Sequence, residues 1–334
     1  MCQYSATDGV VGAWHQVLLG SFVTGGAGLV MAEATAVVPE GRISIRCPGL
    51  WNDDQVVAWQ RVTSFARSQN AMIGVQLAHA GRKGPTMAPW DDHVIASAED
   101  GGWTAVAPSA LAFEGYPVPH ELTLAEIDAI VQHFVAAAAR AMLAGFELLE
   151  VHAAHGYLLH QFLSPLSNRR GDEYGGSFEN RARLLSRIVE ALRGAIPDAM
   201  PLFVRISATD YTEGGWDLEQ SIALAQLLKD RGVDLIDVSS GGNVARVTIP
   251  VGPGYQVGFA GAVRRQASIA TVAVGLITEA TQAEQILDAG DADAVMLARA
   301  FLRNPHWALG AAEALGEKVA WPVQFDRART LRAS

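Results

Sequence analysis

The sequence predicts an α/β fold in which one (β/α)8 barrel, a TIM barrel, takes up residues 1–334 as a single domain. Three observations predict it. Short apolar runs alternate with amphipathic helical patterns along the whole chain. The runs are almost continuously hydrophobic, as parallel strands covered on both faces are. Their spacing is even and no composition shift marks a linker, which favours a closed barrel over an open doubly wound sheet.

The expected strands are the seven short apolar runs. They lie at 28–34, 72–78, 146–152, 202–207, 234–240, 270–275 and 293–298. Between them, apolar residues recur with the period of a helix that buries one face. These patterns place helices at 14–24, 53–69, 123–144, 178–195, 217–231, 256–267 and 280–289. Thr123, followed three residues later by Glu126, has the spacing of a capping box and marks the start of the third helix.

Two features depart from a regular barrel. A barrel of this kind needs eight strands and only seven are found, so we expect the missing one at the start, where the chain enters a helix almost at once. In addition, residues 80–122 form a long connection without helical period. Connections of this length inside a compact domain are usually functional, and we expect this one to be a lid or capping insertion.

Composition and charge exclude several functions. The chain carries 25 Lys and Arg against 35 Asp and Glu, a net charge of −10, which argues against a nucleic-acid or anionic-membrane surface. With only Cys2 and Cys47 there is no disulfide framework. The start, MCQYSATDGVVG, lacks a signal-peptide pattern, and no apolar run is long enough to span a membrane. We therefore predict a cytoplasmic enzyme acting on a small molecule.

In such barrels the active site lies at the carboxyl ends of the strands. The polar residues there are Glu33, Gln76, His79, Arg82, Lys83, His152, His155, Tyr157, Arg205, Asp210, Ser239, Ser240 and Arg299. A phosphate site is expected where VGLIT (274–278) makes a glycine turn and LARAF (297–301) starts a helix. Ordinary turn chemistry explains these two segments equally well.

His152 and His155 allow three interpretations. A metal site needs further ligands, and neither the helical HExxH spacing nor a partner pattern from His79, Cys47 or the acids is present. The imidazoles could be buried packing groups with satisfied hydrogen bonds. They could also donate together to one substrate oxygen, with Tyr157 beside them as a proton donor.

Two other enzyme classes fit poorly. A Schiff-base aldolase needs a lysine at a strand end, and among the three lysines only Lys83 is placed to serve. No GxGxxG follows a strand, so a dinucleotide-binding Rossmann unit is not expected.

The chain resembles the old yellow enzymes, which are FMN-dependent ene-reductases, and within them the bacterial thermophilic-like and xenobiotic reductase group. The matching segments are MCQYSA, GGAGLVMAEATAVVPEGR, QLAHAGRK, HAAHGYLLHQFLSPLSNRRGDEYGGSFENRARL, FVRISATDY, DLIDVSSGG, VGLIT and LARAFLRNPHW. They run in order from end to end. The resemblance implies non-covalent FMN, NADPH or NADH as reductant, and activated alkenes as substrates.

The resemblance also assigns roles. It implies that His152 and His155 bind the carbonyl or nitro oxygen of the alkene, and that Tyr157 delivers the proton while flavin N5 delivers the hydride. Arg205 matches the arginine at the flavin N1/O2 edge, where a fixed cation stabilises the anionic reduced flavin. The other matching residues are Ala34 and Gln76 at the flavin ring, Gly275 and Arg299 at the phosphate, Cys2 as the thiol that tunes the flavin, and Tyr4 and Lys83 on the substrate side.

Two departures from the family pattern stand out. Ala298 replaces the usual glycine before Arg299, which leaves the backbone N–H available. The tail 320–334 resembles an ending in which an arginine reaches into the neighbouring subunit's site, although Phe325 stands where a tyrosine is frequent. Arg327 is the candidate, in a homodimer or homotetramer. A solvated tail arginine is the alternative.

The resemblance finally implies that a hairpin and the first barrel strand precede MCQYS, so the chain as given is expected to lack that strand. Two other functions remain open. One is a different FMN-barrel dehydrogenase or a nitroreductase, although the larger relatives carry cysteine-rich iron–sulfur segments that this chain lacks. The other is a barrel that binds no flavin.

Overall fold

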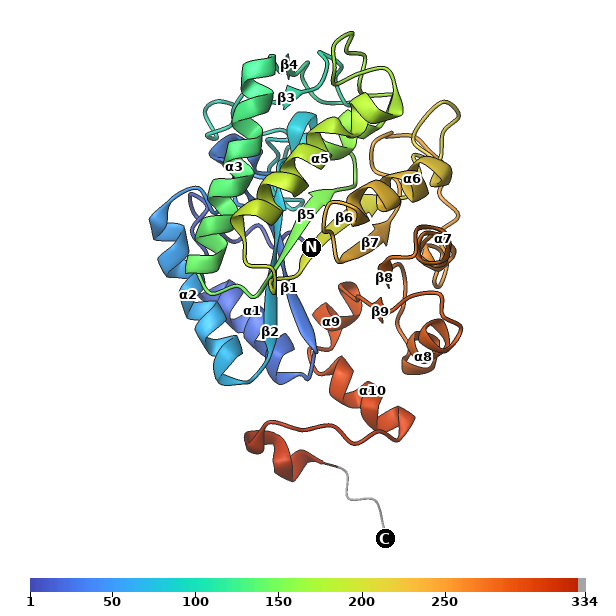
Figure 1. Ribbon diagram of the computed structural model, residues 1–334. Coiled ribbons are helices and arrows are strands. Elements are labelled where there is room, and N and C mark those ends of the chain that lie inside the picture. The colour runs from blue at the N-terminus through green and yellow to red at the C-terminus, as the bar shows by residue number, and fades with distance from the viewer. Residues whose placement is uncertain (330–334) are drawn as a thin grey trace.

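The computed structural model describes residues 1–329, which form a curled parallel sheet with helices packed on its outer side (Figure 1). Its seven strands lie in the order β1-β2-β5-β6-β7-β8-β9. Their bounds are Leu29–Ala36, Met72–Ala78, Leu148–Ala153, Leu202–Ser207, Leu235–Ser239, Ala270–Ala273 and Ala294–Val295. All neighbours pair in parallel, as when Leu29 faces Met72 and Arg205 faces Asp237. The predicted α/β architecture and its seven strands are confirmed.

The sheet has two edges within the described residues. β1 and β9 are the outermost strands, and no pairing joins them there. The sheet is therefore curled like most of a barrel wall but open between β1 and β9. The predicted last strand, 293–298, forms ladder pairs only at Ala294 and Val295.

The predicted helices also form. They are α1 (Ala13–Thr24), α2 (Asp53–Ser68), α3 (Leu124–Leu143), α5 (Phe178–Ala195), α6 (Leu218–Lys229), α7 (Val257–Ala267) and α8 (Ala280–Asp288). The Thr123 side chain accepts a hydrogen bond from Glu126 N, which confirms the capping box. The helix start predicted at 297–301 is confirmed as α9 (Arg299–Arg303), whereas two other short helices were not predicted, α4 (Leu158–Leu163) and α10 (Trp307–Leu315). α4 is buried on all sides, so its sequence carries no amphipathic period.

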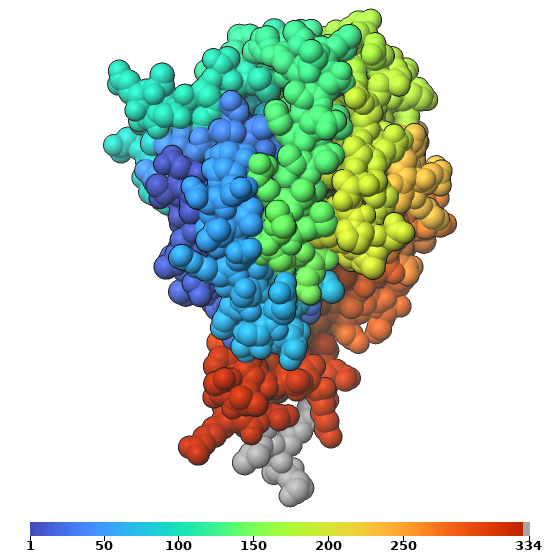
Figure 2. Space-filling model, turned by 60° about the vertical axis from the view of Figure 1, so that its left-hand side comes forward, coloured from blue at the N-terminus to red at the C-terminus, as the bar shows by residue number. Residues whose placement is uncertain are grey.

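Large side chains fill the space between the sheet and the helices. Trp59 of α2 and Phe134 of α3 are completely buried, and the Trp59 ring meets Phe146 edge-on with 5.2 Å between ring centroids. In the space-filling view α2, α3 and α5 lie side by side as adjacent columns on this face (Figure 2). Residues 304–329 project below them.

The long connection 80–122 contains little regular structure. It holds the 3-10 turn η2 (Gly81–Lys83) and a two-stranded sheet of β3 (Val106–Ala107) and β4 (His120–Glu121). Another 3-10 turn, η1 (Pro39–Gly41), follows β1. In the tail, η3 (Val323–Ala328) contains the exposed Arg327, while 330–334 lie outside the described residues. No described helix combines the length and apolar character needed to cross a membrane.

Candidate active site

A cavity of about 790 Å³ opens between the two edge strands and the carboxyl ends of the sheet. This volume is within the range of sites for cofactors and drug-sized ligands. Of the residues predicted from the sequence, seven line it directly: Glu33, Gln76, His155, Arg205, Ser239, Gly275 and Arg299. These residues come from seven separate segments, so the predicted convergence of the strand ends is confirmed for them.

Gly275 makes one corner of the cavity. Its φ of +109° lies in a region that side chains rarely adopt, and an added Cβ would lie 2.7 Å from Gln256 Nε2. Arg299 begins α9 and lines the same cavity. The two segments proposed from the sequence as a phosphate corner therefore face one space.

Arg205 points from β6 towards a buried pair of carboxylates. Its Nε lies 3.4 Å from Asp237 Oδ2, and Gln76 Nε2 donates to Glu150 Oε1 at 2.7 Å. Burial, and next the charge of nearby Asp237, raise the pKa of Glu150 to about 8. Burial also raises the pKa of Asp237, against the opposing effect of Arg205. The two acids therefore hold a proton in common beneath Arg205.

Sequence reasoning missed these two acids. Each stands in the middle of a near-continuous apolar run, LLEVH and LIDVS. An acid in a buried strand is costly unless it has a partner, so its position alone could have indicated a functional residue.

His152 and His155 lie against one another with their rings nearly perpendicular. His152 Nε2 is 3.4 Å from His155 Nδ1, and His155 Nε2 is 2.7 Å from Ser239 Oγ. Burial, followed by the charge of Arg205, holds the pKa of both imidazoles well below the usual range. Both are therefore neutral at pH 7, so each has one N–H to donate.

Their hydrogen bonds restrict where those protons sit. His152 Nδ1 accepts from Ala154 N at 3.3 Å, so its proton is on Nε2, facing His155. Ser239 Oγ donates to Gln256 Oε1 at 3.3 Å, so without a substrate it accepts from His155 Nε2, and His155 Nδ1 faces the His152 N–H as an acceptor. When the hydroxyl turns to donate to His155 Nε2 instead, the His155 proton moves to Nδ1, and both imidazoles then present N–H groups to one point. An oxygen bound there would accept from both.

Tyr157 completes this group. Its ring lies 5.1 Å from the His152 ring, and burial raises its pKa well above the usual range. The phenol is therefore protonated at neutral pH. Lys83 Nζ lies 5.2 Å from the centre of the Tyr157 ring and donates to the carbonyls of His155 and Gly242 at 2.8 and 2.7 Å. Lys83 thus holds the histidine loop in place.

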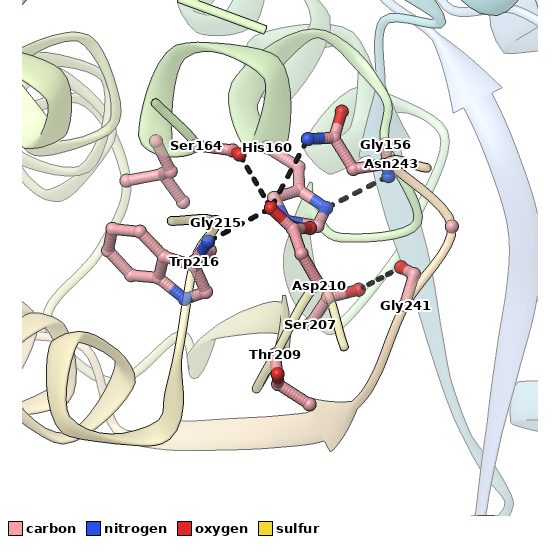
Figure 3. A network of polar contacts seen from close by, with 12 residues as sticks. Gly156, His160, Ser164, Ser207, Thr209, Asp210, Gly215, Trp216, Gly241 and Asn243 are labelled. Carbon is pink, nitrogen blue, oxygen red and sulfur yellow. Dashed lines mark hydrogen bonds and ion pairs between the residues drawn. The ribbon is translucent and has the colours of Figure 1, made fainter. Parts of the chain in front are cut away.

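The loop that carries these residues is strained and firmly held. His155 has a φ of +58°, and Gly156 follows with +72°, where a Cβ would lie 2.3 Å from the Gly242 carbonyl. The N–H of His155 donates to Ser207 Oγ at 2.9 Å. Ser207 in turn donates to the Gly241 carbonyl at 2.8 Å (Figure 3).

A buried network supports the loop from behind, with Asp210 at its centre (Figure 3). His160 Nδ1 accepts from Gly156 N at 2.9 Å, and its Nε2 is 3.1 Å from Asp210 Oδ1. Ser164 Oγ and Trp216 N reach Asp210 Oδ2 at 2.5 and 3.0 Å. Asp210, proposed at a strand end from the sequence, therefore positions the loop and does not line the cavity.

Three of the remaining predicted residues lie beside Tyr157 or on its side of the molecule, and Arg327 does not. Cys2, Ala34 and Tyr157 share a small apolar cluster with Cys47. Tyr4 packs edge-on against Trp90, 5.5 Å between centroids. Arg327 is exposed in η3, and no described contact joins it to the cavity.

The fold is that of an α/β barrel-type protein, and its cavity lies next to a pair of neutral imidazoles and a phenol. The chain belongs to the NADH:flavin oxidoreductase / NADH oxidase family, whose model matches residues 1–317. It is thereby an NAD(P)H-dependent oxidoreductase of the old yellow enzyme type, and its cofactor is FMN.

Individual relatives support the same family assignment. The NADPH dehydrogenase of Bacillus velezensis is 49% identical over 331 residues, covering 98% of this chain and 93% of that protein. The NADPH dehydrogenase of Bacillus subtilis is 46% identical over 330 residues, covering 98% and 92%. Among solved structures, morphinone reductase has a TM-score of 0.78 at 30% identity, covering 96% and 86%. The old yellow enzyme homologue from Zymomonas mobilis has a TM-score of 0.77 at 29% identity, covering 97% and 88%.

Proposed function

We propose that this protein reduces the C=C bond of α,β-unsaturated carbonyl or nitro compounds at the expense of NADPH or NADH. The observation that carries the proposal is the meeting of His152, His155 and Tyr157 beside the cavity. Two neutral N–H donors suit an oxygen that gains negative charge, and a protonated phenol beside them suits proton delivery to carbon. The acidic chain and its two free thiols also suit a cytoplasmic enzyme with small-molecule substrates.

The residues of the cavity fit FMN. Arg205 Nε is buried without a hydrogen-bond partner, so a cationic group is available to an electron-rich ring edge. Gly275, which tolerates no Cβ, and Arg299 suit the phosphate. Gln76 lines the same cavity, and we expect Gln76, Ala34 and Cys2 to contact the flavin ring. When bound, FMN supplies the hydride, and the protein's part is binding and orientation.

Each catalytic side chain has a separate task. His152 and His155 hold the carbonyl oxygen and draw electron density from the alkene. Tyr157 Oη gives its proton to the carbon next to the carbonyl. Arg205 keeps a fixed positive charge at the N1/O2 edge of the flavin, and the nearby carboxylate of Asp237 supports it. Tyr4, Lys83 and, from a neighbouring subunit, Arg327 are proposed to border the substrate.

The test is a pair of anaerobic half-reactions. The purified protein, supplied with FMN, should take it up, lose its yellow colour with NADPH, and recover it on addition of 2-cyclohexenone or maleimide. A colourless protein that takes up no FMN would contradict the proposal. So would a bleached protein that neither alkene restores.

A further inference from the structure

Two thiols and a carboxylate meet beside the cavity. Cys2 precedes α1, Glu33 is on β1, and Cys47 lies in the segment before α2. Their sulfur atoms and a carboxylate oxygen all lie within 4.8 Å of one another. Glu33 and Cys47 are only 7% and 1% exposed, and Cys2 is half-buried. Three metal-binding side chains from separate segments therefore converge on one buried point.

His15 of α1 lies against the Glu33 carboxylate and can fix its orientation. It is 1% exposed, and its Nε2 makes no hydrogen bond although it faces Glu33 Oε1 at 3.4 Å. Its Nδ1 accepts from Gly12 N at 3.4 Å, which leaves the proton on Nε2. The other oxygen, Glu33 Oε2, accepts from Gln3 N at 2.8 Å. Carboxylates that bind metals are held in this way by surrounding donors.

The chemistry of the cluster favours a soft cation. Two sulfurs and one carboxylate oxygen match the ligands of zinc and cadmium, whereas magnesium and calcium require oxygen alone. In a tetrahedral zinc site the ligand atoms lie roughly 3.5 to 3.8 Å apart, so ligand atoms that all lie within 4.8 Å of one another have to approach by about 1 Å at most. No described salt bridge links Glu33 to a lysine or arginine. Glu33 and His15 both line the large cavity, so the cluster borders this space.

We propose that Cys2, Glu33 and Cys47 bind one thiophilic divalent cation such as Zn²⁺, with His15 orienting the carboxylate and the fourth position open. The cluster packs on the same small apolar group as Tyr157. A bound cation also occupies the Cys2 thiol and therefore slows alkene reduction, an effect that rests on the proposed function. Metal binding itself is independent of that function.

The experiment uses the FMN-loaded protein with its thiols kept reduced. One equivalent of Zn²⁺ is added, free metal is removed by gel filtration, and bound zinc is counted by elemental analysis. Cd²⁺ titration, followed by the ultraviolet thiolate-to-cadmium band, reports whether sulfur is bound. Wild-type protein should retain one zinc and Cys47→Ser none. His15→Gln should bind roughly 10- to 100-fold more weakly.

Glu40→Gln is the matched control, because Glu40 is an exposed acid close by in sequence and outside the cluster. It should retain zinc as the wild type does. FMN content and circular dichroism show that each variant is folded, and Cys47→Ala replaces Cys47→Ser if the serine variant is not. Wild-type protein without stoichiometric zinc overturns the proposal, as does equal retention by the Cys47 variant. Wild-type protein that binds one zinc but, when zinc-free, reduces no alkene would count against the proposed function alone.

Discussion

Replacing Glu150 by glutamine tests the buried acid pair, because glutamine has the shape of a protonated glutamate. The pKa of Glu150 is raised from 4.5 to about 8. The folded protein thus holds a proton that the unfolded chain releases, and this contribution to stability is complete below about pH 4.5 and lost as the pH rises through about 8. At about 1.4 kcal/mol per pKa unit, the loss is roughly 5 kcal/mol across that window.

Urea unfolding between about pH 5 and pH 9 measures the effect. We expect Glu150→Gln to match the wild type near pH 5 and to exceed it increasingly towards pH 9. Glu147→Gln, an exposed acid on the same stretch of chain, should follow the wild-type curve. Parallel curves for the wild type and Glu150→Gln would refute the shared proton beneath Arg205.

Three further predictions concern the cavity and the tail. Tyr157→Phe should slow reduction of weakly activated alkenes far more than of nitroalkenes in steady-state assays, whereas an equal loss would argue against proton donation. Gly275→Ala should cost about 1 to 3 kcal/mol of stability and weaken FMN binding in a fluorescence titration. Gly258→Ala, where a Cβ meets nothing within 4 Å, should do neither. Arg327→Ala should raise KM for the alkene if sedimentation shows an oligomer, and an unchanged KM would remove the residue from the site.

Local patterns predicted much of this molecule. Apolar runs located the strands because each is covered on both faces, and the rule that barrel sites lie at strand ends brought Gln76, Arg205 and His155 to one cavity. The resemblance added the roles of the histidine pair and Tyr157. α4 and α10 were missed because six and nine residues offer too little helical period.

The rest depends on contacts between distant segments. The pairing of β6 with β7 places Arg205 beside Asp237, and no local sequence pattern at either residue predicts this contact. Lys83 was expected on the substrate side, yet its ammonium is bound to two loop carbonyls, which only the folded chain brings within reach. The contact between Cys2 and Cys47 also forms only in the folded chain, because 45 positions separate them in the sequence.

The central claim is that His152 and His155 together hold one substrate oxygen. The most direct measurement is the affinity of a simple phenol, followed by the change in flavin absorption, for the FMN-loaded wild type and the double variant His152→Ala/His155→Ala. We predict a loss of affinity of roughly 3 kcal/mol, more than 100-fold, for two hydrogen bonds to a charged oxygen. The rate of bleaching by NADPH should fall much less. Unchanged phenol affinity in a double variant that still binds FMN would contradict the account.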